Sequence, residues 1–216
     1  MAFIIDGTTG IATVDGSVSA PSQRGQDSNS GISYAADTIK FSTGGVERMS
    51  ITNSGISGIS AGITEYDAWY LTANKTSTGV LDANLIRNNR TANAAPLGTG
   101  MSESSGVFTF PSTGKYLVIV QATYELAGGD NVSVHTEVTT DNSNYVDIAH
   151  AFDGNGGSNN RLGGNASFSF IDVTDTSNVK VRFYADSINS GSAVRGIDSS
   201  STFVQTAFHF IRIGDT

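Results

Sequence analysis

From residue 63 to its end, the chain alternates strand-length runs of β-branched and aromatic residues with short clusters of Gly, Asn and Asp. This pattern constrains the fold most, because the first group of residues favours strands and the second favours turns. Runs of this length and spacing are typical of an all-β sandwich or barrel. The strands that we expect are residues 68–73, 80–87, 107–111, 115–126, 132–139, 145–152, 166–173, 178–187 and 202–213.

The alternation within each run indicates which side chains face the core. In the run 178–187, Val181 and Phe183 alternate with charged or polar residues, as in a half-buried antiparallel strand. The runs 116–120 and 203–213 are instead apolar on both faces. A second apolar face indicates a second buried surface, such as a contact between subunits. We therefore expect an antiparallel jelly-roll sandwich that oligomerises.

Residues 1–62 differ in composition from the rest of the chain. They are rich in Gly, Ser, Thr and Asp, and their apolar residues stand in short groups followed by glycine turns. Such segments carry too little apolar area to form a core alone. Either they are disordered, or they are threads that bury their isoleucines only against copies of themselves. We expect residues 1–62 to form an extended glycine-rich fibrous arm and residues 63–216 to form a head domain.

The composition excludes several classes of function. The 216 residues contain 12 Lys+Arg against 20 Asp+Glu, a net charge of −8, and the basic residues do not cluster. We therefore expect no nucleic-acid partner, because phosphate contacts need clustered cations. The chain has no Cys, which excludes disulfides, thiolate zinc sites and cysteine nucleophiles. It shows neither a secretion signal nor an apolar stretch long enough for membrane insertion.

The chain contains one sequence that matches an enzyme motif. Residues 58–62, Gly-Ile-Ser-Ala-Gly, have the letters of a nucleophile elbow. An elbow also needs a buried strand before it and a helix after it, and the flanks supply neither. No pair of carboxylates stands in a recognisable catalytic context either. We expect that the protein is not an enzyme and uses no cofactor.

Two features bear on metal binding. The loop 153–160 is either an oxygen-ligand calcium loop or a plain flexible loop, and its lack of regular carboxylate spacing favours the plain loop. His135, His150 and His209 lie far apart in the sequence, without metal-ligand spacing. Each is expected to be a core or interface histidine bonded to a neighbour. We expect no metal site.

Three aromatic residues, Tyr66, Trp69 and Tyr70, lie at the first predicted strand of the head. They form a sugar-stacking platform, the seal where the arm meets the head, or a core or interface packing contact. Packing is favoured, because the flanking Ala68 and Leu71 are typical of a buried strand.

The run 106–118 carries a resemblance to a known family. Gly106, Phe108, Pro111, Gly114 and Tyr116 reproduce a Gly-x-Phe-Thr-x-Pro-x-x-Gly-x-Tyr hairpin, in which we expect the two aromatic rings to face each other. This motif resembles the globular heads of the complement-q/tumour-necrosis-factor superfamily, and residues 201–208 are similar to the closing strand of those heads. The resemblance covers residues 64–216 and implies a jelly roll that forms compact homotrimers.

Two sets of residues are candidates for contacts. The candidates for trimer or core packing are Phe108, Tyr116, Val118, Val120, Phe208 and Phe210. Polar, glycine-rich loops are the other candidates, because exposed loops carry function on rigid sandwiches. The surface-contact candidates in these loops are Gly128, Asp130, Asn155 and Asn159.

A second resemblance covers residues 31–55. Asp-Thr-Ile-Lys-Phe-Ser-Thr-Gly-Gly at 37–45, followed by Glu-Arg-Met at 47–49, resembles a unit of tail-fibre and other structural proteins of marine bacteriophages. The resemblance implies a virion protein, which we expect to be assembled in the host cytoplasm and exposed on the particle surface. One hypothesis is a short trimeric fibre, spike or knob whose arm binds other virion proteins and whose head adheres to a host-surface glycan or protein. The alternative is a capsid decoration protein that stabilises the shell.

Overall fold

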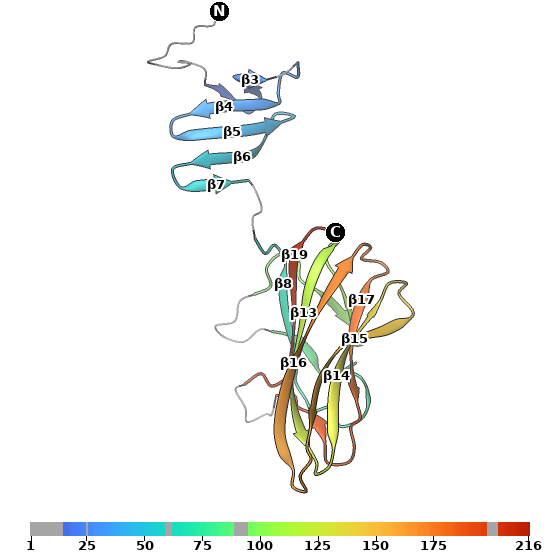
Figure 1. Cartoon of the computed structure of the whole chain (residues 1–216). Helices are drawn as coiled ribbons and strands as arrows, with labels where there is room; N and C mark the ends of the chain where they lie inside the picture. Colours follow the sequence, from blue (N-terminus) through green and yellow to red (C-terminus); the bar gives the residue numbers. More distant parts are fainter. Residues whose placement is uncertain (1–14, 25, 59–61, 89–94, 198–202) are drawn as a thin grey trace, which may run out of the picture. The chain divides into compact units, whose positions relative to one another are not determined.

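A computed structural model describes residues 15–24, 26–58, 62–88, 95–197 and 203–216 of the chain (Figure 1). The chain divides into two compact units, Met1–Ala61 and Gly62–Thr216. All regular secondary structure in the described residues is β. No helix in this part of the chain is long and apolar enough to cross a membrane.

The first unit is built from short antiparallel strands. Two of them form a separate pair, β1 (Gly16–Ser17) and β2 (Ala20–Pro21). The others follow one another in a five-stranded sheet. They are β3 (Gln23–Arg24), β4 (Gly31–Ala35), β5 (Thr38–Thr43), β6 (Val46–Thr52) and β7 (Gly55–Ser57).

This sheet has no apolar core of its own. The buried side chains of β4, β5 and β6 belong to serines, while the isoleucines and Val46 stay exposed to different degrees. Gly44 and Gly45, at φ +59° and +75°, turn the chain back between β5 and β6, a conformation that glycine adopts without steric cost. The described part of the predicted arm is therefore a single-layer meander and not one continuous extended thread. The exposed apolar residues of the meander are Ile39, Val46, Ile51 and Ile56.

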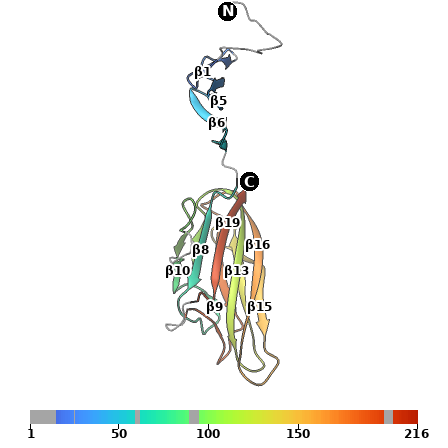
Figure 2. The ribbon, with the colours of Figure 1, turned by 90° about the vertical axis from the view of Figure 1, so that its left-hand side faces the viewer.

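The second unit is a sandwich of two six-stranded antiparallel sheets. One sheet has the order β10-β8-β19-β13-β16, with β18 paired to β13, and the other has the order β11-β12-β17-β14-β15, with β9 paired to β17. Figure 2 shows β8, β19, β13 and β16 of the first sheet side by side. The strands of this head are β8 (Tyr66–Leu71), β9 (Gly79–Val80), β10 (Leu85–Arg87), β11 (Ser102–Ser104), β12 (Val107–Thr109), β13 (Gly114–Leu126), β14 (Asn131–Thr139), β15 (Tyr145–Gly154), β16 (Arg161–Val173), β17 (Lys180–Asp186), β18 (Ala193–Val194) and β19 (Ala207–Gly214).

The core lies between the two sheets and follows the predicted alternation. Every second side chain of β13 and of β17 is buried, as expected for strands that face a core on one side. In the middle of the core, Phe183 of β17 stacks on Phe208 of β19 with ring centroids 4.1 Å apart. The predicted inward face of Val181 and Phe183 is confirmed, since both are fully buried.

The family motif at 106–118 does not form a hairpin. Its first strand, β12, pairs with β11 and β17, whereas β13 pairs with β16, β18 and β19, so the turn crosses from one sheet to the other. The expected contact between Phe108 and Tyr116 is therefore wrong. The ring of Phe110 lies against Tyr116 at 4.7 Å. Phe108 contacts Phe210 of the opposite sheet, with centroids 5.0 Å apart.

Several predicted strand boundaries also need correction. The run 80–87 is not one strand, because β9 and β10 lie in different sheets and Asn84 between them has a φ of +60°. Both Leu81 and Leu85 are nevertheless buried, which explains why the run has the composition of a strand. The final strand begins at Ala207, later than predicted. The short strands β11 and β18 are too polar or too brief to be recognised from the sequence.

Candidate functional site

The outer face of the β10-β8-β19-β13-β16 sheet carries apolar side chains that lie in register on neighbouring strands. Leu117 of β13 lies opposite Phe170 of β16 and Ile211 of β19. Ile119, two residues further along β13, lies opposite Phe168 of β16. Residues two apart on a strand point to the same face. These five side chains form one group, which we call the outer apolar patch.

The outer apolar patch is open to solvent on the single chain. Phe168 and Phe170 are 62% and 74% exposed, and the other three members are half-buried between their neighbours. Single exposed apolar residues are ordinary on protein surfaces, but a contiguous group that includes two phenylalanines marks an interaction site. The prediction that 116–120 has a second apolar face is confirmed. The two phenylalanines of β16 that complete the patch are not among the candidates predicted from the sequence. Their alternation with small residues in 166–173 is the sequence signal that could have revealed them.

Polar groups border the patch at both ends. On one side, the ring of Tyr66 stacks on His209, with centroids 6.4 Å apart. Burial lowers the pKa of His209, and burial followed by the nearby charge of Asp67 raises the pKa of Tyr66. Both groups are therefore neutral near pH 7. On the other side, Lys115 and Asp172 form an ion pair at 3.7 Å.

A small pocket lies at the Lys115–Asp172 end of the patch. It is lined by these two residues together with Phe170, Ile171 and Ile213. The pocket combines an apolar wall with one charge of each sign, so it can accept an apolar side chain whose neighbour is charged or polar.

The six packing candidates predicted from the sequence all lie inside the head. They have at most 1% of their surface exposed, so within one chain they are core residues and cannot touch a second chain directly. On β13, which carries three of them, the side chains that can touch a partner are the alternate ones, Leu117 and Ile119. The buried candidates are Phe108, Tyr116, Val118, Val120, Phe208 and Phe210.

The aromatic residues of β8 serve packing, as favoured above, and do not form an open platform. Tyr70 is 5% exposed. The ring of Trp69 lies edge-on to Phe108, 5.4 Å between centroids, and its Nε1 donates a hydrogen bond to buried Asp67 at 2.9 Å. The guanidinium of Arg87 contacts the same carboxylate at 3.1 Å and lies over the Trp69 ring. This network ties β8 to β10 and covers one face of the Trp69 ring with the Arg87 guanidinium.

The structure brings the two predicted contact loops together. The Gly129 amide donates to the Gly157 carbonyl at 2.9 Å, and the Asn155 amide donates to the Asp130 carbonyl at 2.7 Å. Both loops therefore lie at one end of the head.

Only two of the four loop candidates are exposed, Gly128 and Asn159. Asp130 and Asn155 are buried and hold the loops in place. The Asp130 carboxylate accepts a hydrogen bond from Asn189 Nδ2 at 2.6 Å and another from the Ser192 hydroxyl. Burial alone would raise the pKa of Asp130, but these hydrogen bonds outweigh it and lower that pKa.

In the loop 153–160, the carboxylate that would be the first candidate calcium ligand is paired with an arginine side chain. Arg161 Nη2 lies 2.5 Å from the Asp153 carboxylate, so this carboxylate is already neutralised. Asn155 uses its side-chain amide to bond the carbonyls of Leu126 and Asn159, at 3.2 and 2.7 Å. The plain-loop interpretation therefore fits these residues. Residues 59–61 of the motif at 58–62 lie outside the described residues.

Comparison with known proteins identifies the fold of the head. No family model and no curated protein matches the chain. Among solved structures, Eiger TNF from S. frugiperda is similar with a TM-score of 0.52 and 13% identity, over 70% of this chain and 93% of that chain. Murine APRIL at pH 5.0 aligns over 68% of this chain and 99% of its own, with 9% identity and a TM-score of 0.48. At such low identity the similarity establishes the fold alone: the head is a TNF-like β-sandwich jelly roll.

Proposed function

We propose that this chain is a bacteriophage virion structural protein, a short trimeric appendage whose head adheres to the host surface. The single structural observation behind the proposal is the outer apolar patch, which supports its trimeric part; the virion part rests on the resemblance of residues 31–55. On a single chain, the rings of Phe168 and Phe170 remain largely exposed to water. A protein that assembles with copies of itself buries them in a subunit contact.

Burial of the patch would contribute to the stability of such a contact. Burying a Phe side chain fully contributes about 1.5–3 kcal/mol, and each subunit supplies two of them with 62% and 74% still exposed. The half-buried aliphatic neighbours add to the contact, while the flanking ion pair of Lys115 and Asp172 supplies a polar rim, as is usual at interfaces. The resemblance of the head to the complement-q/tumour-necrosis-factor superfamily favours three copies over two.

The first unit supports the virion part of the proposal. Residues 31–55, which resemble a unit of phage structural proteins, correspond to β4, β5 and β6 and the start of β7. This sheet exposes its isoleucines and buries serines, so it gains stability by packing against other chains. In our proposal its partners are sister chains and other virion proteins, and the head has no catalytic step to perform.

Labelling of particles tests the proposed function. Antibody raised against residues 62–216 should label purified particles of the phage that encodes the chain. A few labelled positions at a tail or vertex support the appendage, whereas label over the whole shell supports the alternative of a decoration protein. Particles without label, from a preparation in which the chain is present in the cell lysate, would refute a virion role. Deletion of residues 1–61 should leave a folded head that no longer joins particles.

A further inference from the structure

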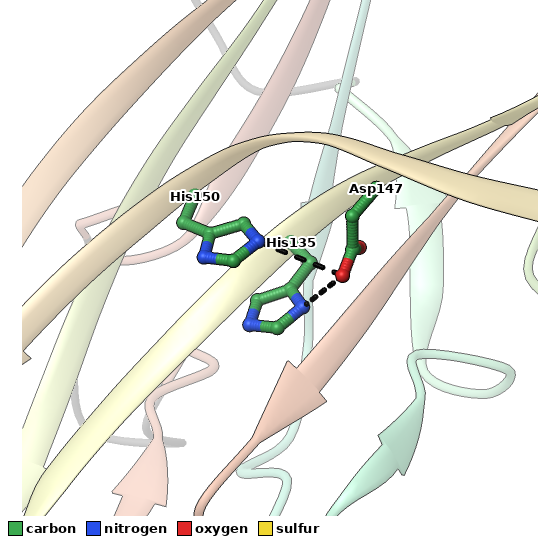
Figure 3. Close-up of side chains that lie close together, drawn as sticks. All are labelled: His135, Asp147 and His150. Carbon is green, nitrogen blue, oxygen red and sulfur yellow. Dashed lines mark hydrogen bonds and ion pairs between the residues drawn. The ribbon is translucent and has the colours of Figure 1, made fainter.

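Two of the three histidines, expected to be separate, lie together with a carboxylate on the outer face of the second sheet. His135 lies on β14, and Asp147 and His150 lie on β15. Asp147 Oδ2 is 3.1 Å from His135 Nδ1 and 3.6 Å from His150 Nε2 (Figure 3). The two imidazole rings are stacked, 3.6 Å between centroids and 5° from parallel. The wide sequence separation of His135 and His150 therefore does not keep their side chains apart in the fold.

Strand pairing explains why sequence spacing hides this cluster. His135 and His150 are direct cross-strand partners in the β14–β15 ladder, so they are neighbours although the chain between them runs through a turn. Asp147, three residues before His150, would point to the opposite face of a regular strand. A β-bulge lies between Thr136 and Glu137, where Asp147 pairs with Glu137. Bulges re-aim side chains, and this one turns Asp147 toward the histidines.

The two nitrogen–oxygen distances in the cluster are close to those between ligand atoms around a tetrahedral zinc ion. Imidazole nitrogens and carboxylate oxygens bind zinc at about 2.0–2.2 Å, which places ligand atoms roughly 3.3–3.6 Å apart around a tetrahedron. The two nitrogen–oxygen distances, 3.1 and 3.6 Å, bracket this value. All three ligand atoms lie within 4.8 Å of one another. Each imidazole coordinates in its own ring plane, so binding needs the rings to open from their parallel stack.

The surroundings of the cluster suit a metal ligand. The side chain of His150 is 47% exposed and that of Asp147 is 44% exposed, so both can rotate toward an ion. His135 is held from behind, because its Nε2 lies 2.8 Å from the hydroxyl of buried Ser133. A serine hydroxyl can donate or accept a hydrogen bond. It can therefore bond the Nε2–H of a His135 whose Nδ1 lone pair binds metal, which is the outer-shell support that metal-bound histidines have.

The neighbouring charges leave the site net negative without blocking it. Glu137, opposite Asp147 on β14, lies 2.5 Å from the guanidinium of Arg182 and is thereby neutralised. The Arg182 guanidinium also lies over the Tyr145 ring, 3.9 Å from its centroid. This arginine is therefore bound elsewhere and does not take the Asp147 carboxylate, whose ion-pair partners are the two histidines.

We propose that His135, Asp147 and His150 bind one divalent transition-metal ion of the zinc class, through two imidazole nitrogens and one carboxylate oxygen. Two histidines and a carboxylate are a frequent zinc ligand set, in which water or a further ligand takes the remaining position. The bound ion links β14 to β15 and stabilises the folded head, since a ligand that binds only the folded state raises its stability.

Calorimetric titration of the tag-free, chelator-treated full chain with zinc chloride tests the proposal. We expect one zinc ion per chain and a higher melting temperature that chelator reverses. Asp147→Asn and His150→Gln should each weaken binding by at least about tenfold, as loss of a ligand costs no less than loss of outer-shell support. The matched controls are His209→Gln, which removes the remaining histidine, and Asp82→Asn, which removes a carboxylate that is 60% exposed. Both should bind zinc as the unaltered chain does.

Two results would overturn the proposal. One is a folded, unaltered chain that neither takes up zinc nor melts at a higher temperature in its presence. The cluster would then be only a hydrogen-bonded histidine pair. The other is zinc binding that Asp147→Asn and His150→Gln leave unchanged. Ser133→Ala distinguishes a residue that positions His135 from one that binds the ion. The variant should bind zinc about 10–100-fold more weakly, still with one ion per chain. The absorption spectrum of bound cobalt(II) should show the same ligand set as in the unaltered chain.

Discussion

Replacement of Tyr116 by alanine tests whether the motif at 106–118 stabilises the core of a single chain. Tyr116 is 1% exposed, and its ring lies 4.7 Å from that of Phe110. Its hydroxyl lies 3.0 Å from the Ser112 hydroxyl and donates to the Ser112 carbonyl at 3.1 Å. One side chain thus combines ring packing with two polar contacts that close the turn between the two sheets.

The two contributions can be separated with a pair of variants. Tyr116→Ala removes a buried ring and leaves a cavity, which costs about 3–5 kcal/mol by analogy with Phe→Ala. Tyr116→Phe keeps the ring and loses only the hydroxyl, which costs about 0.5–1.5 kcal/mol. At about 2–4 °C per kcal/mol for a chain of this size, the alanine variant should melt roughly 6–20 °C lower and the phenylalanine variant at most about 6 °C lower.

Chemical denaturation followed by circular dichroism, at two protein concentrations, measures these costs. Because the side chain is inside the monomer, the loss for Tyr116→Ala relative to the unaltered chain should be the same at both concentrations. An alanine variant as stable as the unaltered chain would refute the core role. A loss that appears only at low concentration would place Tyr116 at the subunit contact instead.

Three further perturbations have defined outcomes. Gly114→Ala should lower the melting temperature more than Gly129→Ala. Both glycines have positive φ, but a Cβ at Gly114 would lie 2.7 Å from a backbone atom, whereas a Cβ at Gly129 would have open space around it. Equal losses of melting temperature would refute steric contact as the cause. Burial lowers the pKa of His209, so the unfolded state takes up the proton first. The stability contributed by neutral His209 is therefore lost as pH falls below about 6.5, and melting of His209→Gln should lack this loss; identical pH profiles would contradict it. The pKa of Asp130 is lowered, so the stability that its carboxylate contributes is complete above about pH 4 and is lost as pH falls further. Asp130→Asn should remove this acid-dependent loss of stability. An unchanged acid transition would show that the hydrogen bonds to Asp130 do not stabilise the loops.

The sequence predicts the fold class of this chain well, because the deciding signal is local. Period-two alternation marks the inward face of strands such as β13 and β17, and glycine clusters mark the turns between them. The second apolar face of 116–120 is visible in the same way. Division of the chain near Gly62 follows from the change in apolar content.

What the sequence does not predict depends on which strands become partners. The motif at 106–118 has the letters of a hairpin, yet its two strands belong to different sheets: β12 pairs with β11 and β17, and β13 pairs with β16, β18 and β19. Leu81 and Leu85 are both buried, but from a loop and a short strand that periodicity cannot distinguish from one longer strand. Asp130 and Asn155 have the composition of exposed loop residues, although their hydrogen bonds bury them.

The histidine cluster shows the same limit most clearly. The distance between His135 and His150 along the chain says nothing about their pairing, which depends on the register of β14 and β15. The orientation of Asp147 depends on a single bulged residue in that register. Neither feature has a local sequence signal.

Sedimentation of the purified full chain tests most directly the claim that the head assembles through the outer apolar patch. We expect a species of about 67 kDa, three times the chain mass of 22.4 kDa. Phe168→Ser combined with Phe170→Ser should shift it toward 22.4 kDa without unfolding the head, since both side chains are exposed. Phe152→Ser, which alters a phenylalanine that is 51% exposed on the other sheet, should leave it unchanged. An unaltered chain that sediments at 22.4 kDa at all concentrations would contradict assembly through the outer apolar patch.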